Sequence, residues 1–145
     1  MSSDTVTALQ NALSDIAQEQ QQNNRKVSQC QVEADRAKVS LQDAEQRETT
    51  ALYEQRLIEN DLKALLALYN NAVDTPHELR PRINKLTGDQ VKAAQRSEAA
   101  SETVTMQKQV LHEVDVRLGI ALEVGKEITA RQQKVYALLQ QEINK

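Results

Sequence analysis

Few side chains in this sequence are of types that do chemistry, and none of them forms a set at catalytic spacing. His112 precedes Asp115 by three residues, a helical spacing at which an imidazole and a carboxylate could hold a metal ion weakly. No further ligand completes such a set, because the other histidine is His77 and the single cysteine is Cys30. The sequence also has no phosphate-binding glycine loop and no catalytic triad pattern. We therefore expect no enzyme, no metal and no cofactor, and we interpret His112 as a solvated surface residue.

The composition points to long helices. Among 145 residues, 39% are hydrophobic and 27% are charged, while the aromatic residues are three tyrosines. A globular core usually takes much of its buried area from aromatic side chains, and only three Gly and two Pro leave little material for the turns of a sandwich or barrel. The prediction is an all-α protein of the composition typical of coiled coils.

The charge and the apolar runs exclude two classes of partner. The net charge of −3 comes from 18 basic and 21 acidic residues, so the basic excess that binds phosphate is missing and we expect no nucleic acid partner. No run approaches the ~20 apolar residues of a spanning helix, so we expect no transmembrane segment. The N-terminus has no signal-peptide pattern and the lone cysteine cannot form an internal disulfide, which favours a cytoplasmic protein.

Two long heptad frames carry most of the structural information. The first frame consists of the 20 positions reached by alternating steps of three and four residues from Val6 to Ala72, and 16 of these frame positions are apolar. The same steps from Ile83 to Glu142 meet one at 12 of 18 positions. An ordinary amphipathic helix drifts ~20° per heptad, so a register held this long indicates supercoiled helices. The sequence predicts one long coiled-coil helix over residues 1–72 and a second over 89–145.

A corner is expected between the helices, over residues 73–88. Thr75 is a candidate N-cap, Pro76 suits a first helical position, and Glu78 could close a capping box. Gly88 then reads as a helix stop and Asp89 as a fresh N-cap. The fold class is therefore two long helices joined by a Pro-containing corner, most simply an antiparallel coiled-coil hairpin that joins a larger helical bundle.

Two pairing registers satisfy the frames. In the preferred one, the numbers of facing residues add up to 162, which places Gly125 against Ala37 and leaves residues 1–17 overhanging. In the other the numbers add up to 155, which requires a second helix that is continuous across Gly88. Whether the hairpin closes on itself or opens to pair between chains stays undecided, as does the number of strands.

Apolar residues outside the frames predict association with further helices, because a two-stranded coil would expose them. Together with the stripe of the overhang, they are the candidate partner-binding residues: Val6, Leu9, Leu13, Ile16, Leu66, Leu68, Val110, Val124 and Leu138.

Three weaker features have both a functional and a structural interpretation. The corner is basic at Arg80, Arg82 and Lys85 and could dock an acidic surface, or be solvated. Cys30 occupies a core position, where it is an inert small hydrophobe or the site of a disulfide between parallel chains. The polar tract over residues 20–24 either specifies a register or partner, or is solvated.

The function that we expect is that of a non-enzymatic coiled-coil adaptor, which binds other helical proteins or copies of itself. A helical chaperone or secretion accessory is the first alternative. A 145-residue antiparallel hairpin is similar in size and outline to the stalk-like FliJ family of flagellar and type III secretion systems. A membrane-surface helix module is the second alternative, which the near-neutral charge disfavours.

Overall fold

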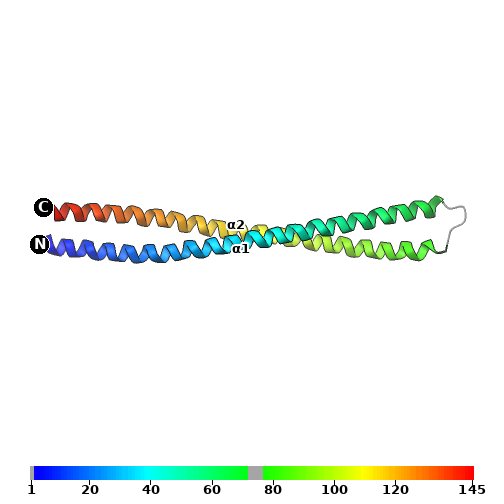
Figure 1. Cartoon of the computed structure of the whole chain (residues 1–145), viewed down its shortest axis with the longest axis horizontal. Coiled ribbons are helices and arrows are strands. Elements are labelled where there is room, and N and C mark those ends of the chain that lie inside the picture. The colour runs from blue at the N-terminus through cyan, green and yellow to red at the C-terminus, as the bar shows by residue number, and fades with distance from the viewer. Residues whose placement is uncertain (1, 72–76) are drawn as a thin grey trace. The chain divides into compact units, whose positions relative to one another are not determined.

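The computed structural model describes residues 2–71 and 77–145, and these residues form two helices (Figure 1). Helix α1 comprises Ser2–Asn71 and α2 comprises Leu79–Ile143, and no strand occurs in either described range. The helices pack against each other as a helical hairpin, which confirms the predicted all-α fold. The proposed cap at Thr75 and helix start at Pro76 lie outside the described residues, as does Ala72.

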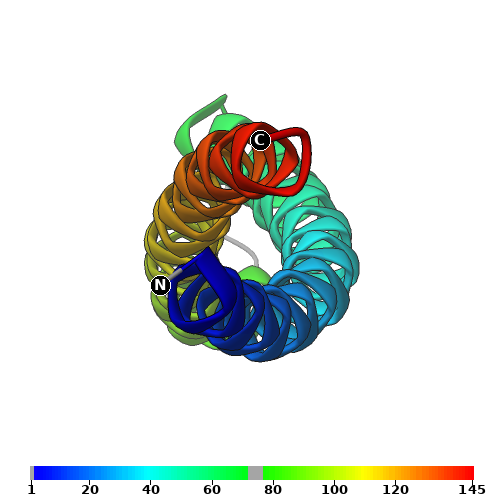
Figure 2. The same ribbon diagram turned by 90° about the vertical axis from the view of Figure 1, so that its left-hand side faces the viewer.

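The hairpin divides into two compact units. Unit 1 combines Met1–Ala37 with Leu111–Lys145, and unit 2 is the continuous segment Lys38–Val110. In unit 1, the first residues of α1 and the last residues of α2 lie at the same end, as the end-on view shows (Figure 2). The two helices of this unit therefore run antiparallel.

The length of α1 follows from its composition. Its 70 residues include neither glycine nor proline, so nothing within Ser2–Asn71 removes a backbone hydrogen bond or adds conformational entropy to the unfolded chain. Most of its residues are strong helix formers such as Ala, Gln, Glu and Leu.

Helix α2 begins earlier than we predicted, at Leu79 instead of Asp89. Pro81 is its third residue, where proline is tolerated because the missing N–H would have no partner inside the helix. The predicted stop at Gly88 is wrong: a glycine stop needs a positive φ, and no described glycine has one. Glycine inside a helix costs only ~1 kcal/mol, and the frame residues on either side of it, Leu86 and Gln90, are half-buried.

The buried residues confirm both heptad frames. Every buried residue of the described chain occupies a frame position, and none lies outside the frames: Ile16, Asn23, Ala34, Ala37, Ala44, Leu62, Ala93, Ser97, Val104, Val114, Ala121, Ile128 and Leu139. The small alanines among them let the helix backbones approach closely but bury little area per residue.

The observed register is neither of the two that we predicted. A Cβ at Gly125 would meet the Asn23 amide, so the numbers of facing residues in unit 1 add up to 148. The Gln20–Gln132 hydrogen bond of unit 1 joins residues whose numbers add up to 152, which is one helical turn from directly facing positions. The Gln55–Ser97 hydrogen bond of unit 2 has the same sum, so each unit taken by itself has this register.

The short connection between the helices explains this register. A sum of 162 would place Asn71, the last residue of α1, opposite residue 91, and a sum of 155 would place it opposite residue 84. A sum of 148 places it opposite residue 77, next to Leu79 where α2 begins. Once Gly88 is inside the helix, only this register lets the hairpin close without a long loop.

The predicted overhang of residues 1–17 is therefore wrong. Ile16 is buried, Leu139 near the other end of α2 is buried, and Glu19 is bonded to Arg131 across the unit. Val6, Leu9 and Leu13, the other members of the expected free stripe, are half-buried. These four side chains belong to the seam inside unit 1.

Candidate functional site

A buried amide makes one of the specific contacts between the two helices of unit 1. Asn23, only 6% exposed, donates a hydrogen bond from Nδ2 to the backbone oxygen of Ala121 at 3.0 Å. The same nitrogen lies 3.0 Å from where a Cβ on Gly125 would stand, so the absence of a side chain at Gly125 leaves the amide room to enter. We expected Gly125 to pack closely against Ala37, but its partner is Asn23.

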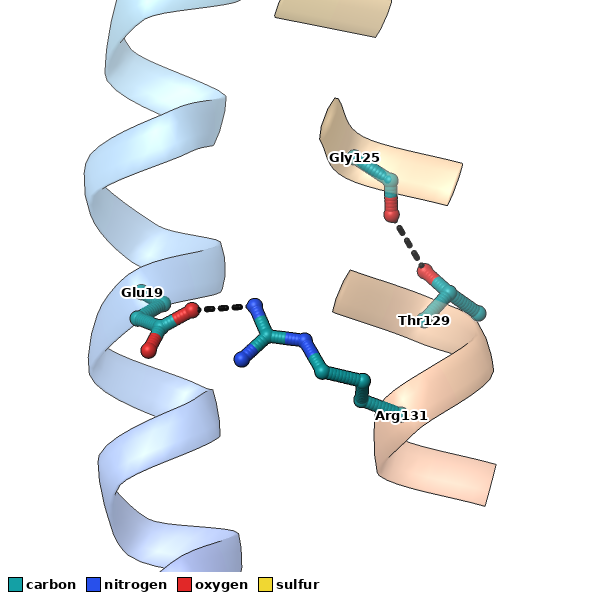
Figure 3. A network of polar contacts seen from close by, with 4 residues as sticks. All are labelled: Glu19, Gly125, Thr129 and Arg131. Atoms are coloured by element: carbon teal, nitrogen blue, oxygen red, sulfur yellow. Dashed lines mark hydrogen bonds and ion pairs between the residues drawn. The ribbon is translucent and has the colours of Figure 1, made fainter. Parts of the chain in front are cut away.

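Next to this amide, polar side chains join the two helices of unit 1. Gln20 donates from Nε2 to Gln132 Oε1 at 3.0 Å, and Arg131 reaches across to Glu19 at 2.5 Å (Figure 3). Arg117 and Glu33 form a second ion pair at 3.4 Å. Of the polar tract, Gln20 and Asn23 thus make contacts within the chain that fix the register.

Unit 2 has one comparable contact. The hydroxyl of Ser97, which is buried, lies 2.6 Å from Gln55 Oε1, and Gln55 in turn donates from Nε2 to Glu59 at 3.2 Å. No buried side-chain polar atom of the described residues lacks a hydrogen-bond partner. The two buried polar residues on the frames, Asn23 and Ser97, are therefore satisfied inside the hairpin.

Two grooves run along unit 1 on either side of Asn23. Lys26, Cys30, Glu33, Arg117 and Val124 are among the residues of one groove. The other groove is lined by residues that include Asn24, Gly119, Leu122, Gly125 and Thr129. Each groove includes one ion pair, Glu33–Arg117 in the first and Glu123–Lys126 in the second.

The expected exposure of the apolar residues outside the frames is confirmed. The candidate binding residues Leu66, Leu68, Val110, Val124 and Leu138 are all exposed, Leu68 the most at 59%. Seventeen large apolar residues of the described ranges are exposed, and none of these lies on a frame position. The structure thus separates the nine candidates into five exposed residues and the four seam residues Val6, Leu9, Leu13 and Ile16.

The residues that could have done chemistry are scattered. His112 is exposed, as predicted, and Asp115 is exposed too, while His77 is exposed next to the start of α2. The described residues contain no group of three or more metal-ligating side chains. Cys30 is a half-buried free thiol, and it lines the groove that also contains Glu33 and Arg117.

The basic residues Arg80, Arg82 and Lys85 are exposed in the first two turns of α2. They belong to the long helix α2 and not to a separate corner, for which we had expected at most a short helix. Whether they dock an acidic surface stays a prediction.

No described helix is long and apolar enough to cross a membrane. Comparison of the chain with protein-family models, with curated proteins and with solved structures found no match.

The Asn23–Gly125 contact is the feature that sequence reasoning missed. Each residue could have been noticed in the sequence, because an amide and a glycine are both unusual at seam positions that are otherwise apolar. They could not be matched to each other while the register was wrong.

Proposed function

We propose that the protein is a non-enzymatic coiled-coil adaptor of the cytoplasm, which assembles with other helices through its exposed apolar side chains. The observation that supports this proposal is the set of seventeen exposed large apolar residues outside the seam. Large exposed apolar patches mark interaction sites, so the proposal requires that a subset of these residues forms one patch.

The exposed apolar side chains supply part of the free energy that binding requires. Full burial of a leucine side chain contributes ~1.5–3 kcal/mol, so a leucine that is half exposed retains about 1 kcal/mol for a partner. Leu68 and Leu138 are 59% and 50% exposed. A handful of such residues in one interface would provide several kcal/mol before the cost of association.

The same exposed surface suits the alternative of a chaperone or export accessory, which would bind many clients instead of one fixed partner. The two functions differ in how many different proteins contact one residue of the exposed surface. Site-specific photocrosslinking in the cells that express the protein can measure this number.

The crosslinker replaces Leu68, and in a control chain it replaces Gln42, which is exposed and lies between the polar residues Asp35 and Thr49 at heptad spacing on α1. An adaptor gives one or two discrete adducts at Leu68 and few at Gln42. A broad smear of adducts that an added unfolded protein removes would support the chaperone function. Equal labelling at both positions would contradict both functions.

A further inference from the structure

The apolar seam of the hairpin does not by itself fix the register. Frame positions recur every seven residues on both helices, so moving α2 by one heptad along α1 again places frame residues opposite frame residues. The numbers of facing frame residues then add up to 155 instead of the observed 148. The movement covers about 10 Å, since a helix rises ~1.5 Å per residue. Polar and charged side chains must therefore discriminate between these two registers.

The polar frame residues of unit 2 are matched better in the shifted register. The observed register places Glu48 opposite Ala100 and Gln107 opposite Leu41. The shifted register places Glu48 and Gln107 opposite each other. A polar side chain on a seam favours the register in which it meets another polar side chain.

In unit 1, the buried amide has a polar partner in either register. Asn23 now donates to the backbone oxygen of Ala121, beside Gly125. In the shifted register it would lie opposite Gln132, whose amide both donates and accepts hydrogen bonds. The shift breaks the Gln20–Gln132 hydrogen bond, so it exchanges one amide pair for another.

The charged residues of unit 1 favour the observed register. The ion pairs Glu19–Arg131 and Glu33–Arg117 lie on one side of the seam, which we call flank 1. In both pairs the residue numbers add up to 150, and the shift would raise this sum to 157. Arg131 would then lie opposite Lys26 and be repelled by it.

In unit 2, flank 1 favours the shifted register. Its residues follow from Glu19 and Arg131 by heptad spacing. The observed register places Glu54 opposite Arg96 but also Asp61 opposite Asp89. In the shifted register Asp61 lies opposite Arg96, so one attraction remains and the repulsion is removed.

The other side of the seam, flank 2, favours the shifted register as well. Asn24 and Leu122 line one groove on this side, and their numbers add up to 146. Two heptads further into the hairpin, the same sum places Lys38 opposite Lys108 in unit 2. After the shift Lys108 would lie opposite Glu45. Because an exposed ion pair contributes little, these opposing preferences leave the two registers close in free energy.

The start of α2 can supply the longer connection that the shift requires. Asn71 would lie opposite residue 84 instead of 77, so residues 79–85 would leave the helix. Pro81 has no N–H to lose, and the first four N–H groups of a helix have no partner inside it. Doubling the length of a loop adds little to its entropic cost. The helix stays continuous across Gly88.

We propose that the hairpin is a register switch, in which α2 slides by one heptad along α1 between the observed register and the register whose facing numbers add up to 155. The observed register is the more populated one because its connection is shorter. A shift in the opposite direction is disfavoured, because it places Lys26 opposite Arg117 and Arg47 opposite Arg96. A partner that binds one register more tightly shifts the population toward it.

Disulfide trapping in unit 1 measures the shifted register. Every chain carries Cys30→Ser and Ala34→Cys, and the second cysteine replaces Val114, Ala121 or Ile128. These residues lie opposite Ala34 when the facing numbers add up to 148, 155 and 162. A disulfide requires Cβ atoms about 4 Å apart, whereas successive positions in this series are about 10 Å apart along the helix. We expect rapid crosslinking with Val114→Cys, and crosslinking with Ala121→Cys at least about tenfold faster than with Ile128→Cys.

A charge reversal in unit 1 should favour the shifted register. Arg131→Glu turns the attraction to Glu19 into repulsion in the observed register, and it turns the repulsion from Lys26 into attraction in the shifted one. The rate of crosslinking between Ala34→Cys and Ala121→Cys should rise at least about threefold.

A matched reversal in unit 2 should have the opposite effect. Lys108→Glu relieves the repulsion from Lys38 in the observed register and creates a repulsion from Glu45 in the shifted one. The same crosslinking rate should fall at least about threefold. Both reversals change the net charge by the same amount, so a general effect of charge or stability would move the two rates in the same direction. Circular dichroism at 222 nm verifies that each variant is folded.

Two results would overturn the register switch. One is crosslinking with Ala121→Cys that is no faster than with Ile128→Cys. The other is a change of the rate in the same direction by Arg131→Glu and Lys108→Glu. Salt at about 1 M should bring the two reversal variants together, because it screens exposed charges.

Discussion

Replacing Gly125 by alanine sets two effects of similar size against each other. Alanine is better than glycine inside a helix by ~1 kcal/mol. The added methyl group, however, would lie 3.0 Å from the Asn23 nitrogen, which must then move by a few tenths of an ångström. That nitrogen is bonded to the oxygen of Ala121 at 3.0 Å in a buried position, so movement weakens the hydrogen bond.

The cost of displacing the amide is larger than the gain in helix propensity. A buried donor that loses its partner costs ~1–3 kcal/mol. The net expectation for Gly125→Ala is a loss of about 1 kcal/mol in the free energy of unfolding. Gly119 of the same helix has no atom within 4 Å of its Cβ position, so Gly119→Ala should gain about 1 kcal/mol.

Urea unfolding followed by circular dichroism at 222 nm measures the difference between the two variants, which we expect to be about 2 kcal/mol. A third chain, Asn23→Ala with Gly125→Ala, removes the amide that the methyl group displaces. In this background the Gly125 substitution should become stabilising. If Gly125→Ala instead stabilises the wild-type chain as much as Gly119→Ala does, the close approach of Asn23 is refuted and the inferred register loses its main support.

Two further substitutions test the seam and the ion pairs. Ile128 is 3% exposed and Ile120 is 60% exposed, so Ile128→Ala should lower the free energy of unfolding by about 2–4 kcal/mol and Ile120→Ala by less than about 0.5 kcal/mol. Equal losses in the same urea experiment would contradict the burial pattern. Arg131→Ala removes an ion pair whose side chains are about half exposed and should cost less than about 1 kcal/mol, with the difference vanishing at high salt. A loss above about 2 kcal/mol that persists in salt would show a larger role for this pair.

The helices and their seams were predictable because both depend on local properties of the chain. Residues 2–71 contain no helix breaker, and the steps of three and four residues mark the side that faces the partner helix. Ile128 and Val104 could thus be assigned to the core from their positions alone, and Leu68 and Tyr136 to the surface.

Gly88 shows where this local reasoning ended. A glycine followed by Asp89 has the pattern of a helix stop and a new cap, because glycine readily adopts a positive φ and aspartate accepts hydrogen bonds from free N–H groups. Helix α2 nevertheless continues through Gly88, because glycine in a helix costs only ~1 kcal/mol and half-buried frame residues lie on both sides of it. That comparison requires knowing what packs against α2, which the sequence around Gly88 does not state.

The amino-acid sequence by itself determined two helices, the side that each one buries and the apolar residues left exposed, because periodicity is a property of each helix alone. The tertiary structure decided which positions face each other. Registers seven residues apart all pair frame positions with frame positions, so they differ little in hydrophobic burial. The choice among them came from the short connection between Asn71 and Leu79 and from the fit of the Asn23 amide beside Gly125, and both are relations between residues far apart in the sequence.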